Sequence, residues 1–219
     1  ILEAYGIRCP RIEVATDVAG VVAAAVRAGG PVAVKLDGAA FLHKSDVGGV
    51  VLGVSGAEAA KATAERLMAV AHKVAQGTPW RFLIQKMAKP GTELVMGVRS
   101  DPVFGPLLLV GLGGIYVEIL KDVQFGLVPL TPVLARRLLR RLRAFPLLEG
   151  VRGGKPVDLV SVEQTLLRLS QLVEEHPSIL EVEMNPVVAR PDGVEALDVR
   201  LRVAALVPTD ARRPVAAAF

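Results

Sequence analysis

The side chain best suited to chemistry lies in a loop rich in glycine. Residues 43–49 read His-Lys-Ser-Asp-Val-Gly-Gly. Imidazole titrates near neutral pH, so His43 can act as a base, a ligand or a nucleophile. The paired glycines, Gly48 and Gly49, would let the backbone approach a phosphate closely. The same run also fits a polar turn whose histidine only forms hydrogen bonds.

A lysine interrupts the apolar run that precedes this loop. Residues 31–36 predict a strand, and Lys35 lies near its end. Burying an unpaired ammonium group is costly, so Lys35 must face water or an anion. The alternative is a lysine on an edge strand that extends its charge into solvent.

Oxygen-bearing side chains recur near the end of the chain. Glu181, Glu183 and Asn185 precede a Pro191-Asp192-Gly193 turn, and Asp198 follows it. Carboxylate and amide oxygens of this kind suit Mg²⁺, although a solvent-facing hairpin would carry the same residues. No Cys/His cluster favours zinc, and no GxxxxGK[ST] run favours a P-loop.

Composition narrows the class of protein. Hydrophobic residues make up 52% of the chain and charged residues 22%, which predicts a packed core. Aromatic residues are only 4%, which argues against a binder of single-stranded nucleic acid. The net charge of +4 suits an anionic ligand such as a nucleotide or coenzyme A (CoA). We interpret the arginine run in residues 136–143 as the solvated face of a helix.

The single cysteine, Cys9, excludes an intrachain disulfide and favours a reducing compartment. The longest apolar region, residues 104–117, contains glycines and a proline and is too short to span a bilayer. We therefore expect a soluble, cytoplasmic protein without a membrane partner. The start at Ile1 leads us to expect a piece of a longer polypeptide.

Hydrophobic periodicity and turn residues predict a mixed α/β or α+β chain. A turn at Pro90 predicts a smaller lobe, residues 1–88, and a larger lobe, residues 89–219. Helices are expected at residues 17–27, from a Ser55–Glu58 capping box to about 73, from Thr131-Pro132 onward and at 162–175. Strands are expected at residues 31–36, 49–54, 81–87, 92–99, 107–110, 122–128, 179–184 and 194–201, and residues 146–158 as a glycine-rich connection.

Four runs, in this order, carry a resemblance to a known family. They are PVAVKLDGAAFLHKSDVGGV (31–50), the segment 84–123, LLEGVRGGKPVD (147–158) and EVEMNPVVARPDGVEALDVRL (181–201). The chain resembles the ATP-grasp domain of ADP-forming (NDP-forming) acetyl-CoA and acyl-CoA synthetases, which is related to the nucleotide-binding subunit of succinyl-CoA synthetase. The resemblance implies an ATP-grasp fold with the nucleotide between two lobes.

The resemblance also implies roles for single residues. Lys35 matches the lysine that holds the nucleotide phosphates. His43 matches a histidine that is transiently phosphorylated, in a phosphate-side loop that includes Ser45, Gly48 and Gly49. Glu118 falls in the segment near the path of phosphoryl transfer. The remaining matches are Gln85, Lys86 and Met87 beside adenine, Glu93 on the ribose side, and Asn185 and Asp198 as Mg²⁺ ligands.

The implied activity is that of an acid–thiol ligase that uses ATP/ADP and Mg²⁺ and works by a phosphohistidine relay. The relay needs a CoA-binding domain or subunit, which this chain lacks. Two departures predict local changes: Gly126 replaces a frequent arginine, and Val151 replaces a frequent tyrosine. Two other functions are open: a synthetase-like regulatory domain of a multidomain protein lysine acetyltransferase, and a non-catalytic module whose arginine helix docks a partner or nucleic acid.

Overall fold

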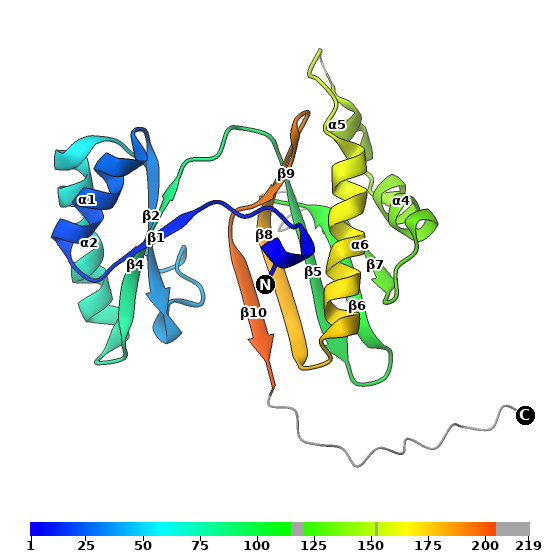
Figure 1. The fold of residues 1–219 in the computed structure, drawn as a ribbon, viewed down its shortest axis with the longest axis horizontal. Helices are drawn as coiled ribbons and strands as arrows, with labels where there is room; N and C mark the ends of the chain where they lie inside the picture. The colour runs from blue at the N-terminus through cyan, green and yellow to red at the C-terminus, as the bar shows by residue number, and fades with distance from the viewer. Residues whose placement is uncertain (115–120, 152, 205–219) are drawn as a thin grey trace, which may run out of the picture. The chain divides into compact units, whose positions relative to one another are not determined.

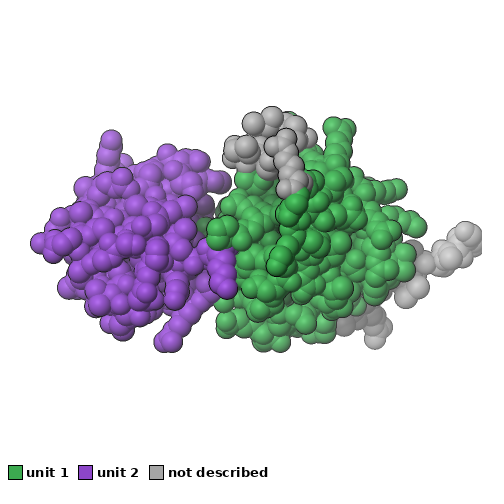
Figure 2. All heavy atoms as spheres, turned by 90° about the horizontal axis from the view of Figure 1, so that it is seen from above, with its two compact units in different colours: residues 1–9, 90–219 green, residues 10–89 purple. Residues whose placement is uncertain are grey.

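A computed structural model describes residues 1–114, 121–151 and 153–204 of the chain. The chain divides into two compact units, which Figure 2 colours separately. Unit 2 is Pro10–Lys89, and unit 1 combines Ile1–Cys9 with Pro90–Phe219. Each unit has a hydrophobic core of its own. That these units are the lobes that hold a nucleotide stays a prediction.

Unit 2 is a four-stranded antiparallel sheet with two helices against one face (Figure 1). The strand order is β1-β4-β2-β3, so β2 is a central strand. The strands are β1 (Ile12–Ala15), β2 (Val32–Gly38), β3 (Val50–Val54) and β4 (Trp80–Lys86), and the helices are α1 (Val18–Ala28) and α2 (Gly56–Ala75).

Alternation along β2 separates the two faces of this sheet. Val32, Val34 and Leu36 are fully buried and pack in the core with the helices. Successive side chains of a strand point to opposite faces, so Lys35 and Asp37 lie on the other face. We call this second face, which neither α1 nor α2 covers, the helix-free face of the sheet.

The two helices of unit 2 begin differently. Asp17 caps α1, because its carboxylate accepts the Gly20 N–H at 2.7 Å. The capping box predicted at Ser55 and Glu58 is wrong: Ser55 precedes α2, but its side chain caps no N–H group. Gly56, the first residue of α2, has a φ of 79°, and a capping box needs a helical residue at that position.

Unit 1 contains a larger sheet with the order β10-β8-β5-β6-β7, and β9 also pairs with β8. The three helices among its described residues lie against one face of this sheet (Figure 1). The helices are α4 (Pro132–Arg141), α5 (Phe145–Glu149) and α6 (Leu159–Glu175). The strands are β5 (Thr92–Asp101), β6 (Gly105–Leu112), β7 (Val123–Leu127), β8 (Ile179–Arg190), β9 (Gly193–Ala196) and β10 (Val199–Val203).

The first nine residues pack on α6, which explains why they group with unit 1. A short 3₁₀ turn, Glu3–Tyr5, presents the Tyr5 hydroxyl, which donates to the Glu175 carboxylate. The Arg168 guanidinium donates to the Gly6 carbonyl at 2.5 Å. From the sequence we predicted that these residues belong to the first lobe. Their contacts are with positions far away in the chain, and such contacts leave no local sequence pattern.

Most predicted elements are present, with shifted ends. Thr131 caps α4, and Pro132 is its first residue, as predicted. The expected connection at residues 146–158 contains most of α5, and the last predicted strand is divided into β9 and β10. β1 was not predicted. In the described part of the chain, no helix combines the length and apolar character needed to cross a membrane.

Candidate functional site

Lys35 and Gln85 meet on the helix-free face of the sheet in unit 2. The Lys35 ammonium donates to the Gln85 side-chain oxygen at 3.1 Å. Only 8% of Lys35 and 4% of Gln85 is exposed, although both are polar. An ammonium group at this depth must be paired, so the alternative of a solvated lysine on an edge strand is excluded. Lys35 lies instead in the middle of a central strand.

The loop of His43 is anchored beside Lys35. Its last residue, Gly49, accepts the backbone N–H of Leu36 at 2.8 Å. The loop therefore leaves β2 and returns to it one residue from Lys35. His43 is exposed, and in the described part of the chain its imidazole has no hydrogen-bond partner. An exposed imidazole on an anchored loop can accept a transferred group.

The glycines of this loop are needed for its fold. Gly48 has a φ of 70°, a left-handed conformation that favours glycine. A Cβ on Gly49 would lie 2.9 Å from the Lys44 carbonyl oxygen. The N–H groups of both glycines are bonded inside the loop, to Ser45 and Lys44. Phosphate binding by Ser45 and the two glycines stays a prediction.

The residues predicted near the nucleoside lie at the ends of strands in two units. Lys86 ends β4 and Met87 follows it, both exposed, and the Met87 N–H donates to Pro31 at 2.9 Å. Glu93 is exposed on β5 in unit 1. One Glu93 carboxylate oxygen lies 3.1 Å from where a Cβ on Gly114 would be. The Glu93 side chain thus lies over the glycine-rich end of β6.

Asn185 and Asp198 are adjacent in unit 1. The Asn185 N–H donates to the Asp198 carbonyl at 3.0 Å, beside the pairing of β8 with β10. Asn185 is exposed and Asp198 is half-buried. Among the described residues, no group of three or more His, Cys, Asp or Glu could hold a metal ion. Together these two residues offer one amide oxygen and one carboxylate as side-chain ligands for a cation.

Glu118, which the sequence placed near the phosphoryl-transfer path, lies outside the described residues. The other predicted site residues form two groups. Unit 2 carries Lys35, Gln85, Lys86, Met87 and the loop of His43, and unit 1 carries Glu93, Asn185 and Asp198.

The structure adds two polar contacts that the sequence did not predict. Arg81 on β4 donates to the Asp37 carboxylate at 2.7 Å. In unit 1, the buried Asp122 accepts the N–H groups of Arg143 and Ala144 at 3.0 and 2.9 Å, which fixes the chain between α4 and α5. Asp37 stands two residues after Lys35, and strand alternation could have placed it on the same face.

The arginine run behaves as the sequence predicted. All five arginines in and just after α4 are exposed, while Ala135, Leu138 and Leu139 face the core. Arg136 forms a two-pronged ion pair with Glu163 of α6, at 3.1 and 3.2 Å.

Close packing explains one departure from the family pattern. A Cβ on Gly126 would lie 2.8 Å from Leu138 and 3.2 Å from Leu130. Gly126 faces the core from the edge strand β7, so a larger side chain would displace the leucines of α4 and its N-terminal flank.

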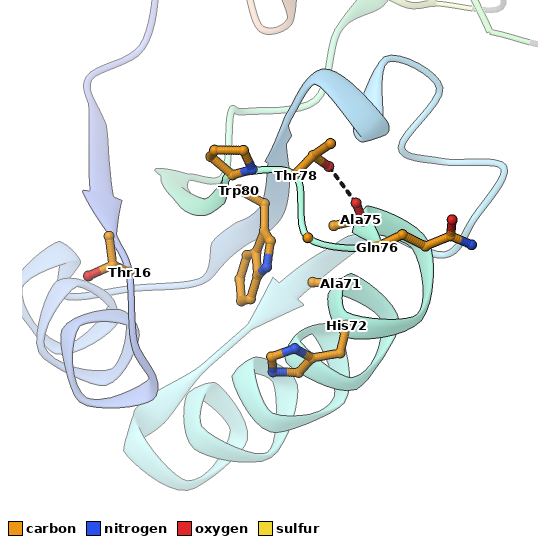
Figure 3. Close-up of a pocket in the computed structure, with 9 residues that line it drawn as sticks. Thr16, Ala71, His72, Ala75, Gln76, Thr78 and Trp80 are labelled. Atoms are coloured by element: carbon orange, nitrogen blue, oxygen red, sulfur yellow. Dashed lines mark hydrogen bonds between the residues drawn. The ribbon is translucent and has the colours of Figure 1, made fainter.

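A hollow of about 360 Å³ lies at the end of α2 in unit 2 (Figure 3). His72 and Trp80 line it with their rings edge to face, 5.9 Å apart. The Thr78 hydroxyl donates to the Ala75 carbonyl at 2.6 Å at its rim. None of the predicted site residues lines this hollow. His72 is exposed, as the sequence predicted for it.

Comparison with known proteins identifies the family. The sequence pattern of a family described as an ATP-grasp domain matches residues 1–203. The chain belongs to this ATP-grasp family. Several of its relatives among curated proteins are CoA ligases named as ADP-forming. An acetate–CoA ligase (ADP-forming) I of Archaeoglobus fulgidus is 39% identical over 92% of this ATP-grasp chain. The beta subunit of acetate–CoA ligase (ADP-forming) I of Pyrococcus furiosus is 36% identical, also over 92%.

The relatives differ in how much of them this ATP-grasp chain spans. It spans 29% of the length of the Archaeoglobus ligase but 87% of the Pyrococcus beta subunit. A solved structure of the dinucleotide-forming acetyl-coenzyme A synthetase 1 of Ca. Korarchaeum cryptofilum, in complex with coenzyme A, Ca-AMPCP and HgCl⁺, superimposes with a TM-score of 0.88. It is 32% identical, covering 93% of this chain and 89% of that one. Protein PH1788 of Pyrococcus horikoshii gives a TM-score of 0.87 at 35% identity, covering 93% and 87%.

Proposed function

We propose that this chain is the nucleotide-binding, phosphoryl-transferring part of an ADP-forming acyl-CoA ligase, an acid–thiol ligase. The observation that carries the proposal is the anchoring of the His43 loop at Leu36, next to the buried Lys35. This arrangement holds a cation and an exposed imidazole on one segment of chain. Phosphoryl transfer needs both a group that neutralises phosphate charge and a group that accepts the phosphoryl.

Lys35 supplies the positive charge for the nucleotide phosphates in this proposal. Its ammonium group keeps a hydrogen bond to Gln85, which limits its motion before the nucleotide binds. A preorganised cation stabilises developing charge without reorganising during the reaction. Lys86, Met87 and Glu93 would contact the nucleoside, as the resemblance implies.

Asn185 and Asp198 would hold Mg²⁺ together with the nucleotide. Their amide and carboxylate oxygens suit a hard cation that keeps several waters and takes its other ligands from phosphate groups. Two protein ligands are enough for such a site, and the backbone hydrogen bond between these residues keeps them adjacent. The ion supplies charge neutralisation at the phosphates. A solved relative was prepared with Mg-AMPPCP, which supports the assignment.

The His43 imidazole accepts the γ-phosphoryl group. A bond forms between an imidazole nitrogen and the γ-phosphorus, while the bond from that phosphorus to the bridging oxygen breaks. ADP leaves with the electron pair of that bond, and the imidazolium proton passes to solvent. His43 then passes the phosphoryl group to a histidine of the CoA-binding partner, where acyl phosphate and then acyl-CoA form. The Korarchaeum synthetase has a structure with a phosphorylated phosphohistidine segment, which supports such a relay.

The partner in this proposal is a CoA-binding domain or subunit. The support is that the chain spans 87% of a separate beta subunit but 29% of a longer single-chain ligase. We also propose a cytoplasmic location, on the basis of the single cysteine, and no role for nucleic acid.

The relay is tested with the chain reconstituted with a CoA-binding domain of a relative. His43→Asn is expected to abolish acyl-CoA synthesis and leave ATP affinity unchanged, because the imidazole carries the phosphoryl group and is not a main binding contact. Labelling with γ-labelled ATP and quenching in base preserves phosphohistidine, which peptide mapping then locates. His72→Asn is the matched control, since His72 is an exposed histidine of the same unit.

Full acyl-CoA synthesis by the His43→Asn protein would contradict the relay. Label that survives in His43→Asn at the level of His72→Asn would do the same. Loss of ATP binding in His43→Asn would instead give His43 a role in binding.

A further inference from the structure

The helix-free face of unit 2 carries a row of polar side chains that extends past Lys35. Strand β2 places Lys35 and Asp37 on this face, and β4 contributes Gln85 and Arg81. The register pairs Asp37 directly with Arg81, and Lys35 reaches Gln85 across the same two strands. The row therefore begins with the Lys35–Gln85 pair and ends with the Asp37–Arg81 pair.

The Asp37–Arg81 pair lies at the base of the His43 loop. Asp37 is the next-to-last residue of β2, and the loop returns to the same strand at Leu36. Gly38 is packed too tightly for a side chain, because an added Cβ would lie 2.6 Å from the Pro79 carbonyl oxygen. The strand ends around Asp37 and Arg81 are thus held closely together.

Arg81 has binding capacity that its partner does not use. Its Nε donates to Asp37 at 2.7 Å, and among the described residues Asp37 is its only partner. The two Nη groups remain available as donors, and 55% of the side chain is exposed. A guanidinium presents its donors in a planar fork that matches two oxygens of a phosphate group.

A surface ion pair of this kind contributes about 0–1 kcal/mol to stability, so stability does not explain its place in the row. The place itself suggests a ligand. Gln85 and Arg81 are four residues apart on β4, or about 13 Å of strand. That is of the same order as an extended nucleoside triphosphate. If the base lies near Gln85 and Lys35 meets the inner phosphates, Arg81 comes next, toward the loop of His43.

We propose that Arg81 binds the terminal phosphate of the nucleotide and that Asp37 positions its guanidinium. This inference rests on the proposed function, because it assumes that the helix-free face of unit 2 receives a nucleotide. Arg81 is then a second cation in addition to Lys35. It lies at the end of the row where the terminal phosphoryl group is bound before its transfer. Asp37 keeps the Nε side of the fork occupied, which leaves the Nη groups directed to the ligand.

The test is calorimetric titration of the full chain with AMP, ADP and ATP in the presence of Mg²⁺. Arg81→Gln is expected to weaken ATP binding about tenfold, equivalent to about 1.4 kcal/mol, with a smaller effect on ADP and none on AMP. Arg81→Lys keeps the charge but not the fork, so its effect should be intermediate. Asp37→Asn should weaken ATP binding less than Arg81→Gln and add nothing to it in the double variant.

The matched control is Arg27→Gln. Arg27 forms a similar exposed ion pair with Glu13 at 2.6 Å, and it belongs to α1 on the opposite face. The Arg27→Gln protein should bind all three nucleotides like the wild type. Thermal unfolding of every variant checks that the fold is kept.

The outcomes separate this inference from the proposed function. Equal ATP affinity in Arg81→Gln and Arg27→Gln overturns the role of Arg81, and so does a loss that is the same for AMP and ATP. If Lys35→Met still gives a loss that grows with the number of phosphates, the proposed function stands without Arg81. If the wild-type chain binds no ATP, both fail.

Discussion

The two units of this chain share one plan, a sheet with helices against one face, but they are filled by different side chains. The helices of unit 2 contribute mainly alanines to the core, including Ala60, Ala64 and Ala71. The helices of unit 1 contribute leucines, including Leu139, Leu166 and Leu169. Small side chains let helices approach a sheet closely, whereas leucines fill a larger space. The units should therefore respond differently to the same kind of substitution.

The polar residues of the two units also lie at different places on their strands. In unit 2, Lys35 and Gln85 are buried inside strands, where they interrupt apolar runs. In unit 1, Glu93 and Asn185 are exposed. Buried polar groups must find partners within the fold, so the unit 2 pair is preorganised. The exposed residues of unit 1 can take up ligands with less rearrangement of the core.

The largest expected effect is on the leucine core of unit 1. Leu166→Ala should lower the free energy of unfolding by about 3 kcal/mol, because it truncates a fully buried side chain and leaves a cavity. Hydrogen exchange should show lost protection in β5 and β6, which contact α6, while β2 and β4 keep theirs. Val160→Ala is the control, since Val160 on the same helix is 68% exposed. Equal loss of protection in both sheets would contradict independent cores.

The next effect concerns the buried cation of unit 2. Lys35→Met keeps the length of the side chain and removes its charge. ATP affinity should fall by about 2 kcal/mol, the scale of a hydrogen bond to a charged group, with smaller losses for ADP and AMP. Lys61→Met, an exposed lysine of α2, should leave all three affinities unchanged. A uniform loss across the three nucleotides would mean that Lys35 supports the fold of the sheet and does not bind phosphate.

A smaller effect is expected at the pair Asn185 and Asp198 of unit 1. Asp198→Ala should weaken Mg-ATP binding about tenfold, or about 1.4 kcal/mol, and change metal-free ATP binding much less. The reason is that the proposed function assigns the Asp198 carboxylate to the ion and not to the nucleotide itself. Titrations with and without Mg²⁺ measure both, with Asp192→Ala in the turn of the same hairpin as the control. Equal losses with and without the ion would give Asp198 a structural role.

The sequence predicted what local patterns encode. The interruption of an apolar strand marked Lys35, and Thr131-Pro132 marked the start of α4. Strand β1 escaped prediction because it has only four residues, Ile12–Ala15, with an acidic residue among them. The Asp37–Arg81 contact joins positions 44 residues apart, so it depends on the register of β2 with β4. No local sequence pattern predicts that register.

The predicted Mg²⁺ ligands, in contrast, are brought together by a local turn. The family resemblance assigned roles to Asn185 and Asp198, and the structure places them side by side through a backbone hydrogen bond. The sequence predicted this adjacency, because the turn at 191–193 folds the second strand back beside the first. Strands β9 and β10 both pair with β8 in the register that this turn sets, with Val187 opposite Ala196 and Met184 opposite Val199, so Asp198 comes opposite Asn185.

The smallest expected effect compares the helix caps of the two units. Asp158 is the N-cap residue of α6 in unit 1, where its carboxylate accepts the Ser161 N–H at 3.0 Å and the Ser161 hydroxyl at 2.6 Å. The hydrogen bond from the Ser161 hydroxyl, and to a smaller extent that from the Ser161 N–H, lowers the pKa of Asp158 below its ordinary value. A carboxyl group with a lowered folded-state pKa stabilises the fold above its unfolded-state pKa of about 3.9, and this stability is lost as the pH falls.

Asp158→Ala should therefore cost about 1 kcal/mol at pH 7, the usual scale for an N-cap, and less near pH 3. Urea denaturation of wild type and variant at the two pH values measures the difference. Asp17→Ala removes the corresponding cap of α1 in unit 2, with a similar cost expected at pH 7. If the cost of Asp158→Ala is the same at both pH values, the hydrogen bonds at this cap do not depend on ionisation of the carboxylate. In that case the cap acts through geometry alone.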